Sequence, residues 1–179
     1  RPSSIVKELV ENSIDAGSTG ISVEIRDGGT SLIRITDNGS GIPRDQIALA
    51  FQRHSTSKIR NASDLSFIRS LGFRGEALSS IAAVSRTQLC TKTKDSLTGS
   101  LYMISGGEEE SLKEAGLPDG TTVIVKDLFY NTPARLKFLK SDRAEGANCV
   151  NLALRCALGH PEISLRCIRD GKDALFTPG

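Results

Sequence analysis

Hydrophobic and polar residues near the amino terminus recur with a helical period. One half of the helical wheel, drawn at about 100° per residue, carries Ile5, Val6, Leu9, Val10, Ser13 and Ile14. Glu8, Asn12 and Asp15 are spaced i, i+4 and i+7, so they share a narrow strip on the other half. This pattern predicts an amphipathic helix that ends at Ala16, with Gly17 in the left-handed position that follows the last turn.

Alternation with a period of two predicts strands in much of the remaining chain. The first hairpin starts at Ile21, turns at residues 27–29 and ends at Asp37. Further strands are expected at residues 87–92, 99–104, 121–126, 163–168 and 174–176. Further helices are expected at residues 44–50, 76–83, 131–138 and 143–158. The acidic run at residues 108–110 is interpreted as a solvated edge.

Helices interspersed among antiparallel hairpins, without regular βαβ units, indicate an α+β fold. We expect a two-layer α/β sandwich with a mixed, mostly antiparallel sheet and helices on one face. The 179 residues fit one domain, residues 1–179. Residues from about 51 to 75 are polar and rich in Ser, Thr and Arg. A long segment of this kind inside a compact domain is typical of a lid over a site.

Composition narrows the possible functions only moderately. The formal net charge is +2, which does not by itself indicate nucleic-acid binding, and Trp is absent. The four cysteines form no CxxC pair and lie far in sequence from both histidines, so zinc-ligand spacing is missing and we interpret them as reduced structural thiols. No P-loop sequence occurs, and the Gly39/Gly41 pair lacks the third glycine of a dinucleotide-binding loop.

The polar strip of the first helix carries the first candidate chemistry. Glu8 and Asn12 place a carboxylate one turn from a neutral carboxamide, a pair that cannot form a salt bridge. An amide oxygen suits Mg²⁺, and a carboxylate suits activation of a nearby water. The alternative is an ordinary solvated helix face.

Two glycine-containing segments add to this picture. Asp37 ends a strand just before Gly39 and Gly41, where a carboxylate can accept from an exocyclic amine and the glycines let a flat ring approach the backbone. Residues 71–78 form a glycine-flanked turn that leads into a helix, and free N–H groups there favour an anion such as phosphate. Each segment is also compatible with an ordinary turn. The combination, in this chain order, is much more specific.

Together these motifs resemble the GHKL ATPases, the superfamily of the gyrase B subunit, the large heat-shock chaperone, histidine kinases and MutL. Residues 8–15 resemble its N-box, 37–41 and 72–75 its two glycine boxes, and 120–122 its late threonine motif. Within the superfamily, residues 6–16, 53–59, 72–81 and 128–135 resemble MutL-type mismatch-repair proteins, in a form that looks bacterial.

The resemblance implies a role for each matching residue. Glu8 would be the general base that polarises the attacking water, and Asn12 would supply a side-chain oxygen to Mg²⁺. Asp37 would accept from the adenine amine, with Thr121 nearby and with Gly39 and Gly41 shaping the pocket. The phosphates would be lined from the lid by Thr56, Ser57, Lys58, Gly72, Phe73, Arg74, Gly75, Glu76, Ala77 and Leu78. Asp15 would support the helix, and His54 would be structural.

The resemblance also implies how the protein works. ATP and Mg²⁺ would be cofactors of slow hydrolysis that acts as a conformational switch in DNA mismatch repair. The partners of the full-length protein would be a MutS-type mismatch-recognition protein, DNA and a second copy that binds on ATP binding. The chain would be a fragment that lacks a preceding segment and the following domains. The location would be cytoplasmic in a bacterium or nuclear in a eukaryote, without membrane contact.

Two other interpretations remain open at this stage. The domain could be a nucleotide-gated scaffold or dimerisation module, in which binding rather than hydrolysis matters. It could also be a histidine kinase catalytic domain, but that class leaves residues 128–135 unexplained.

Overall fold

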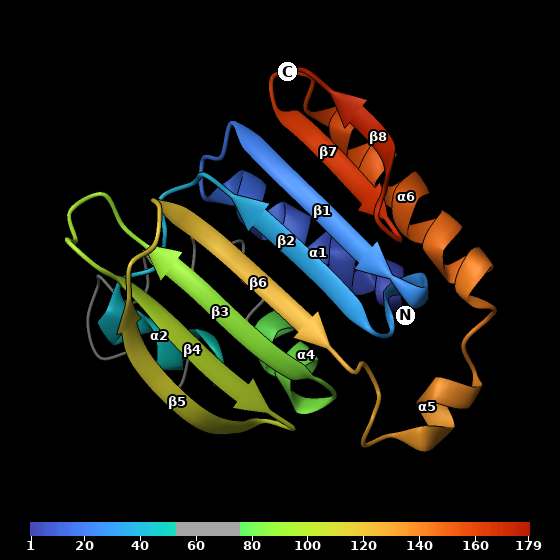
Figure 1. Ribbon diagram of the computed structural model, residues 1–179, viewed down its shortest axis with the longest axis horizontal. Coiled ribbons are helices and arrows are strands. Elements are labelled where there is room, and N and C mark those ends of the chain that lie inside the picture. Colours follow the sequence, from blue (N-terminus) through green and yellow to red (C-terminus); the bar gives the residue numbers. More distant parts are fainter. Residues whose placement is uncertain (53–75) are drawn as a thin grey trace.

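One mixed sheet with the strand order β5-β4-β3-β6-β2-β1-β7-β8 organises the part of the chain that the computed structural model describes, residues 1–52 and 76–179 (Figure 1). The strands are β1 (Gly20–Arg26), β2 (Leu32–Asp37), β3 (Arg86–Lys92), β4 (Gly99–Ser105), β5 (Glu108–Ala115), β6 (Gly120–Lys126), β7 (Ser164–Arg169) and β8 (Lys172–Thr177). Strand β1 pairs with β7 in parallel, and the other neighbouring pairs of this sheet are antiparallel.

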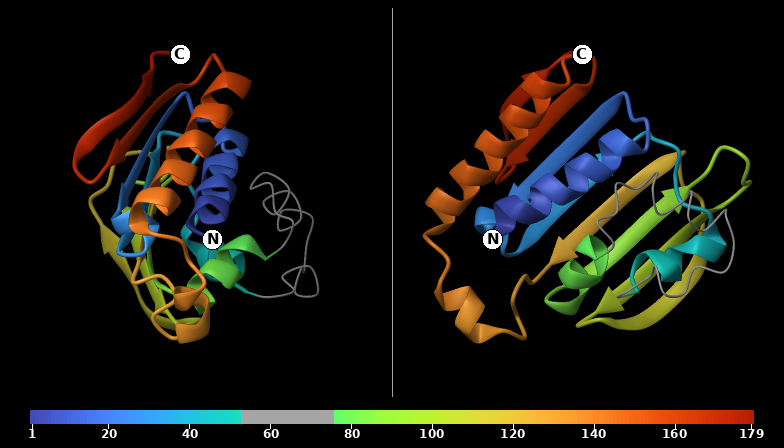
Figure 2. Two further views of the ribbon diagram at one scale, coloured as in Figure 1. Left: turned by 90° about the vertical axis from the view of Figure 1, so that its right-hand side faces the viewer. Right: turned by 180° about the vertical axis from the view of Figure 1, so that it is seen from behind.

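The helices cover one face of this sheet, as the edge-on and rear views of Figure 2 show. They are α1 (Pro2–Asp15), α2 (Arg44–Ala50), α4 (Ala77–Ala83) and α6 (Asp142–Gly159). The short α5 (Pro133–Lys137) lies beyond the edge of the sheet and has no buried residue (Figure 1). The predicted α+β sandwich is therefore confirmed. None of the described helices has the length and apolar character needed to cross a bilayer.

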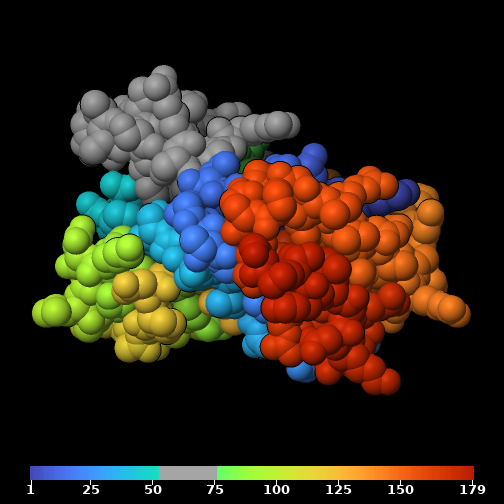
Figure 3. All heavy atoms as spheres, turned by 90° about the horizontal axis from the view of Figure 1, so that it is seen from above, coloured from blue at the N-terminus to red at the C-terminus, as the bar shows by residue number. Residues whose placement is uncertain are grey.

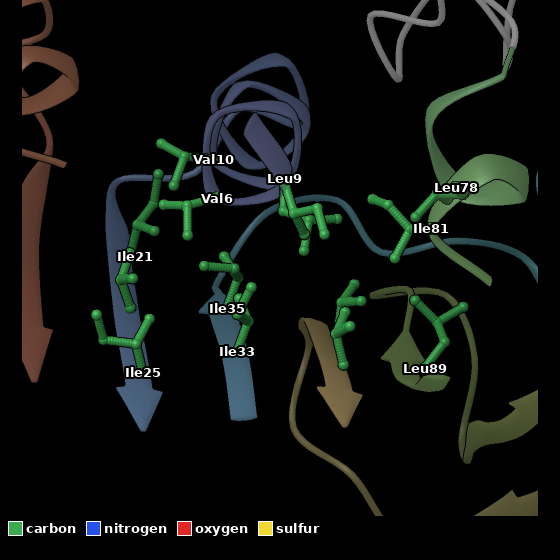
Figure 4. Close-up of a cluster of buried hydrophobic side chains, with 14 of the residues drawn as sticks. Val6, Leu9, Val10, Ile21, Ile25, Ile33, Ile35, Leu78, Ile81 and Leu89 are labelled. Carbon is green, nitrogen blue, oxygen red and sulfur yellow. The ribbon is translucent and has the colours of Figure 1, made fainter. Parts of the chain in front are cut away.

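The apolar half of α1 packs onto the centre of the sheet. Val6, Leu9 and Val10 point toward strand residues such as Ile33 and Ile35 (Figure 4). Gly17 follows the helix with φ +76°, the left-handed conformation predicted for it. Because the buried face is directed at the sheet, the opposite strip of α1 is held in a fixed orientation.

The first and last parts of the chain adjoin in space. The parallel β1–β7 pairing joins the amino-terminal hairpin to the carboxy-terminal one, and α6 packs beside α1. Figure 3 shows the corresponding blue and orange-to-red atoms in contact. This parallel junction could not be predicted from local patterns, because it depends on partners about 140 residues apart.

Two local features are more regular than predicted. Residues 108–110 are exposed at the edge of the sheet, as predicted, but they also begin the eight-residue strand β5, which was not predicted. Its side chains are largely exposed, so no apolar alternation marked the strand. The predicted turn at residues 27–29 does connect the antiparallel strands β1 and β2, and it takes the form of a short 3-10 helix, Asp27–Gly29.

Candidate functional site

A row of polar side chains crosses three neighbouring strands at the end of the sheet. Asp37 of β2 is paired with Thr121 of β6, and Thr121 is paired with Thr91 of β3. Residues directly opposite each other in antiparallel strands project to the same face. The row is followed by an apolar one in which Ile35, Val123 and Leu89 are aligned in the same way.

Both oxygens of the Asp37 carboxylate are held in place. The Ser13 hydroxyl donates to Oδ2 at 2.7 Å, and the backbone N–H of Gly39 donates to Oδ1 at 2.9 Å. Burial raises the pKa of Asp37 above its ordinary value, while these hydrogen bonds oppose the rise. The carboxylate is therefore oriented and partly desolvated, which suits an acceptor of a ligand hydrogen bond.

The glycines that follow Asp37 lie against other backbone segments. Gly41 has φ +73°, and a Cβ atom added there would overlap the carbonyl oxygen of Lys92. A Cβ added at Gly39 would approach the Cβ of Ala16 to 2.8 Å. Only residues without a side chain let this segment pass between the end of α1 and strand β3.

A small cavity, the Asp37 cavity, lies between these groups. It is lined by Leu9, Asn12, Ser13, Ala16, Ile35, Asp37, Gly41, Ile42, Leu78, Leu89, Thr121 and Val123. Its volume of about 30 Å³ has room for one or two waters and not for a purine ring. Five of the predicted site residues, Asn12, Asp37, Gly41, Leu78 and Thr121, thus line one narrow space.

A larger cavity, the Glu8 cavity, lies about one helical turn closer to the amino-terminal end of α1. It measures about 350 Å³, within the usual range for small-molecule pockets, and Glu8 is in its wall. Its other lining residues are Arg1, Ser4, Ile5, Glu76, Ala77, Ser80, Ile81, Val84, Phe129 and Arg135. Glu76, Ala77 and Leu78, predicted to act together, are therefore split between the two cavities.

Helix α4 forms the partition between them. Leu78 faces the Asp37 cavity, whereas Ala77 and Ile81 face the Glu8 cavity. Both Leu78 and Ile81 point toward the sheet in Figure 4. A modest displacement of this helix would join the two spaces into one groove along α1.

The polar strip of α1 is available to a ligand at two of its three positions. Within residues 1–52 and 76–179, the side chains of Glu8 and Asn12 have no hydrogen-bond or ion-pair partner. Asp15 is exposed and lines neither cavity. The helix was predicted correctly, and its strip divides into two cavity-lining residues and one solvent-facing residue.

The segment 128–135 secures the carboxy-terminal end of α4. Phe129 donates its backbone N–H to the carbonyl of Val84 at 2.7 Å, and the Asn131 amide donates to the carbonyl of Ala83 at 2.9 Å. Phe129 and Arg135 also line the Glu8 cavity. The segment therefore connects the wall of the Glu8 cavity with the helix that partitions the site.

Several predicted site residues lie outside the described residues. They are Thr56, Ser57, Lys58, Gly72, Phe73, Arg74 and Gly75, together with most of the predicted lid and with His54.

Sequence reasoning missed two residues of the polar network, Ser13 and Thr91. Ser13 was assigned to the apolar half of α1, yet its hydroxyl orients Asp37. A lone hydroxyl within that apolar half was the available signal. Thr91 looked like any strand residue, because only the register with β6 places it beside Thr121.

Comparison with known proteins decides the family. A model of the histidine kinase-, DNA gyrase B- and HSP90-like ATPases matches residues 1–117. The chain belongs to this family. The predicted resemblance to MutL-type proteins within it is also confirmed. The chain is 62% identical over all 179 residues to the DNA mismatch repair protein MutL of Agathobacter rectalis, and 50% identical to that of Streptococcus pyogenes serotype M5.

Solved structures in this ATPase family give the same result. The ADP complex of the Aquifex aeolicus MutL ATPase domain superposes with a TM-score of 0.81 at 32% identity, covering 99% of this chain and 63% of that one. A second structure of the Aquifex aeolicus ATPase domain gives a TM-score of 0.76. The chain spans only 28% of the length of the Agathobacter rectalis protein and 27% of the Streptococcus pyogenes one.

Proposed function

We propose that this domain binds ATP with Mg²⁺ along α1 and hydrolyses it slowly, as a conformational switch in DNA mismatch repair. The observation that carries the proposal is the Asp37 carboxylate, fixed by Ser13 and Gly39 and facing the same cavity as Asn12 and Thr121. The similar Aquifex aeolicus domain was solved in complex with ADP, which supports nucleotide binding by this domain.

Asp37 would accept a hydrogen bond from the exocyclic amine of adenine. Its oxygens accept hydrogen bonds from the Ser13 hydroxyl and the Gly39 N–H, and the Ser18 side chain and the Thr121 backbone also stabilise the ionised form, so a ligand amine would share the carboxylate with these donors. Gly39 and Gly41 have no side chain that would keep a base ring away from the adjoining backbone. Leu9, Ile35 and Val123 supply apolar surface for the ring. Guanine carries a carbonyl oxygen where adenine carries the amine, and a carboxylate disfavours that oxygen.

Asn12 fits a role as a Mg²⁺ ligand. Asn12 lines the cavity, its side chain has no competing partner within the described residues, and a carboxamide oxygen is the kind of hard donor that Mg²⁺ accepts. When bound, the ion would neutralise phosphate charge. The predicted lid residues 56–58 and 72–76 would complete the phosphate environment from the other side.

Glu8 would act as the general base. It lies one helical turn from Asn12, so a water beside the terminal phosphate would be within reach of its carboxylate. The carboxylate would take a proton from that water as the water oxygen bonds to the terminal phosphorus and the bond from that phosphorus to the bridging oxygen breaks, releasing ADP.

Nucleotide binding would require α4 to move. The Asp37 cavity is too small for adenine while Leu78 closes it, and the larger Glu8 cavity lies on the other side of the same helix. Displacing α4 would open a continuous groove and would pull on segment 128–135, which is bonded to the end of α4. Such a coupled shift is a physical basis for a switch.

The wider role belongs to the longer protein. We propose that ATP binding brings two copies together and that the dimer links a MutS-type mismatch-recognition protein and DNA to later repair steps. This role would place the protein in the cytoplasm of a bacterium.

Two variants on one helix test the proposal. Asn12→Ala is expected to abolish binding of Mg²⁺ with a non-hydrolysable ATP analogue, as measured by calorimetry. Glu8→Ala is expected to change ATP affinity by only a few fold but to lower turnover of the full-length protein by about a hundredfold or more, the scale of a lost general base.

Asp15→Ala is the matched control, because Asp15 is on the same helix and faces solvent. Both affinity and turnover should stay within about twofold of the unmodified protein. Full ATP affinity in Asn12→Ala would overturn the assignment of this site.

A scaffold in which nucleotide binding alone does the work is the second candidate. It is favoured by the position of α4 between the two cavities, because nucleotide binding alone would then have to displace this helix. The two mechanisms separate in a repair assay, because a binding-only scaffold would keep its function in Glu8→Ala and lose it in Asn12→Ala.

A further inference from the structure

Arg135 brings an unpaired cation to the wall of the Glu8 cavity. It belongs to the short helix α5, which has no buried residue, and its side chain is exposed. Within residues 1–52 and 76–179 its guanidinium has no hydrogen-bond or ion-pair partner. All its N–H groups are therefore available to an anion that enters the cavity.

The charges around the cavity show why a phosphate there would need this cation. Two carboxylates, those of Glu8 and Glu76, line the cavity and would repel a phosphate. The cations among the lining residues are Arg1 and Arg135. The backbone of Arg1 is bonded to the first turn of α1, so this residue stays with the helix that carries Glu8. Arg135 instead reaches the cavity from a separate element.

The backbone that leads into α5 is held in a conformation that costs energy. Phe129 has φ +65°, although a bulky side chain disfavours the left-handed region, and Asp127 has φ +51°. Phe129 is only 6% exposed and its N–H donates to the Val84 carbonyl at 2.7 Å, so the fold keeps this turn in place. Strained residues that their surroundings hold in this way cluster at functional sites. Here the turn brings α5 to the cavity, since Phe129 and Arg135 line the same space.

The same turn connects Arg135 with the helix that separates the two cavities. Val84 is the residue at which α4 ends, and the Asn131 amide donates to the carbonyl of Ala83 in its last turn. A displacement of α4 would therefore change the position of Arg135 at the cavity. In the opposite direction, an anion held by Arg135 would favour one position of α4.

We propose that Arg135 binds the terminal phosphate of ATP in the Glu8 cavity and thereby distinguishes ATP from ADP. The inference rests on the proposed function, because it needs the triphosphate to extend along α1 from Asn12 to Glu8. A guanidinium presents two parallel N–H groups to two phosphate oxygens, and it offsets the repulsion from the Glu8 carboxylate. ADP lacks this phosphate, so the difference between the two nucleotides would reach α4 through segment 128–135.

The test compares two nucleotides on the unmodified protein and on Arg135→Ala. Calorimetry with the full-length protein and Mg²⁺ measures the affinity for ADP and for a non-hydrolysable ATP analogue. In Arg135→Ala the affinity for the analogue should fall about tenfold or more, the scale of a hydrogen bond to a charged group. The affinity for ADP should change by less than about twofold, because the lost contact is to the phosphate that ADP lacks.

Lys137→Ala is the matched control. It also removes a basic residue from the last turn of α5, but Lys137 is exposed and does not line the Glu8 cavity. Both affinities should stay within about twofold of those of the unmodified protein. Because α5 has no buried residue, neither substitution removes a packed side chain, and thermal unfolding checks that both variants are folded.

A second protein concentration separates a phosphate contact from a contact between two copies. The measurement is repeated at about tenfold higher concentration, because the ATP analogue is also proposed to bring two copies together. A lost phosphate contact would weaken binding equally at both concentrations. A loss that disappears at the higher concentration would place Arg135 between the copies and overturn its role at the phosphate.

The outcomes also separate this inference from the proposed function. If the unmodified protein binds neither nucleotide, the proposed function is wrong. If it binds both, but the ratio of the two affinities is the same in Arg135→Ala, the proposed function stands and the role of Arg135 is overturned.

Discussion

At the scale of single residues, the site is defined by how few degrees of freedom its polar groups retain. Asp37 is fixed by a hydroxyl from α1 and an amide from its own turn, and Thr121 is fixed by Thr91. Preorganised groups of this kind lose little entropy when a ligand binds. The unfavourable desolvation of the partly buried Asp37 carboxylate is already present in the protein without a ligand.

Asp37→Asn should therefore separate binding from stability. The amide places a donor where the carboxylate accepts, so ATP affinity should fall by about 10- to 100-fold, the scale of a hydrogen bond to a charged group. Thermal stability at pH 7 should stay equal or rise, because burial raises the pKa of Asp37 and its ionised form opposes folding there.

The pH dependence checks the same residue. ATP affinity of the unmodified protein should be full above the pKa of Asp37 and decline as the pH falls through it, starting at a higher pH than for an ordinary aspartate. Asp37→Asn should lack this decline when both proteins are measured by calorimetry across the acidic range. A parallel decline in both would assign it to other groups.

Sequence alone identified the residues whose types carry chemistry, such as Glu8, Asn12 and Asp37. It could not identify Ser13 or Thr91, whose roles depend on which strand lies beside which. A hydroxyl on a buried face is compatible with many structural contacts, so its type indicates little before the register is known. Recognition of the family supplied the roles but not these supporting contacts.

At the scale of elements, the glycine segment after β2 shows how close packing sets the site. Gly41 and Gly17 have nearly the same φ, +73° and +76°, but very different surroundings. A Cβ at Gly41 would overlap the Lys92 carbonyl, whereas one at Gly17 would meet nothing within 4 Å.

The helices and most of the strands could be predicted from the periodicity of apolar residues. Strand β5 could not, because an exposed edge strand needs no apolar face.

Gly41→Ala and Gly17→Ala form a matched pair that isolates the close approach of Gly41 to Lys92. Each replacement should cost about 1–2 kcal/mol for the left-handed conformation. Gly41→Ala should cost at least about 1 kcal/mol more and should lower ATP affinity at least tenfold, because the segment must move off β3. Denaturant unfolding and calorimetry measure the two effects, and equal losses in both variants would show that close approach is unimportant.

At the scale of the whole molecule, α6 and β7 enclose the most deeply buried thiols. Cys149 and Cys167 are fully buried, whereas Cys90 and Cys156 are half-buried, and all four are free, as predicted. Burial raises the pKa of Cys149 to about 12 and that of Cys167 to about 11. At neutral pH both are protonated and shielded, so reaction with a thiol reagent requires opening of the α6–β7 layer.

Cys149 and Cys167 should therefore react at least about a hundredfold more slowly than Cys90 at pH 7.5. Mass spectrometry after timed alkylation resolves the individual sites, and Cys90→Ser provides the control for assignment. Denaturant should bring the rates of all four cysteines together. Fast labelling of Cys167 in native buffer would mean that the terminal hairpin opens independently of the remaining sheet.

The parallel contact between β1 and β7 has a consequence for how the protein is made. As the chain leaves the ribosome, β1 emerges before β7, and its outer edge lacks this neighbour until more than a hundred further residues have been translated. During that interval the nascent sheet exposes an open border that another polypeptide can join. Chaperone protection of the growing amino-terminal hairpin should therefore matter most before β7 is synthesised.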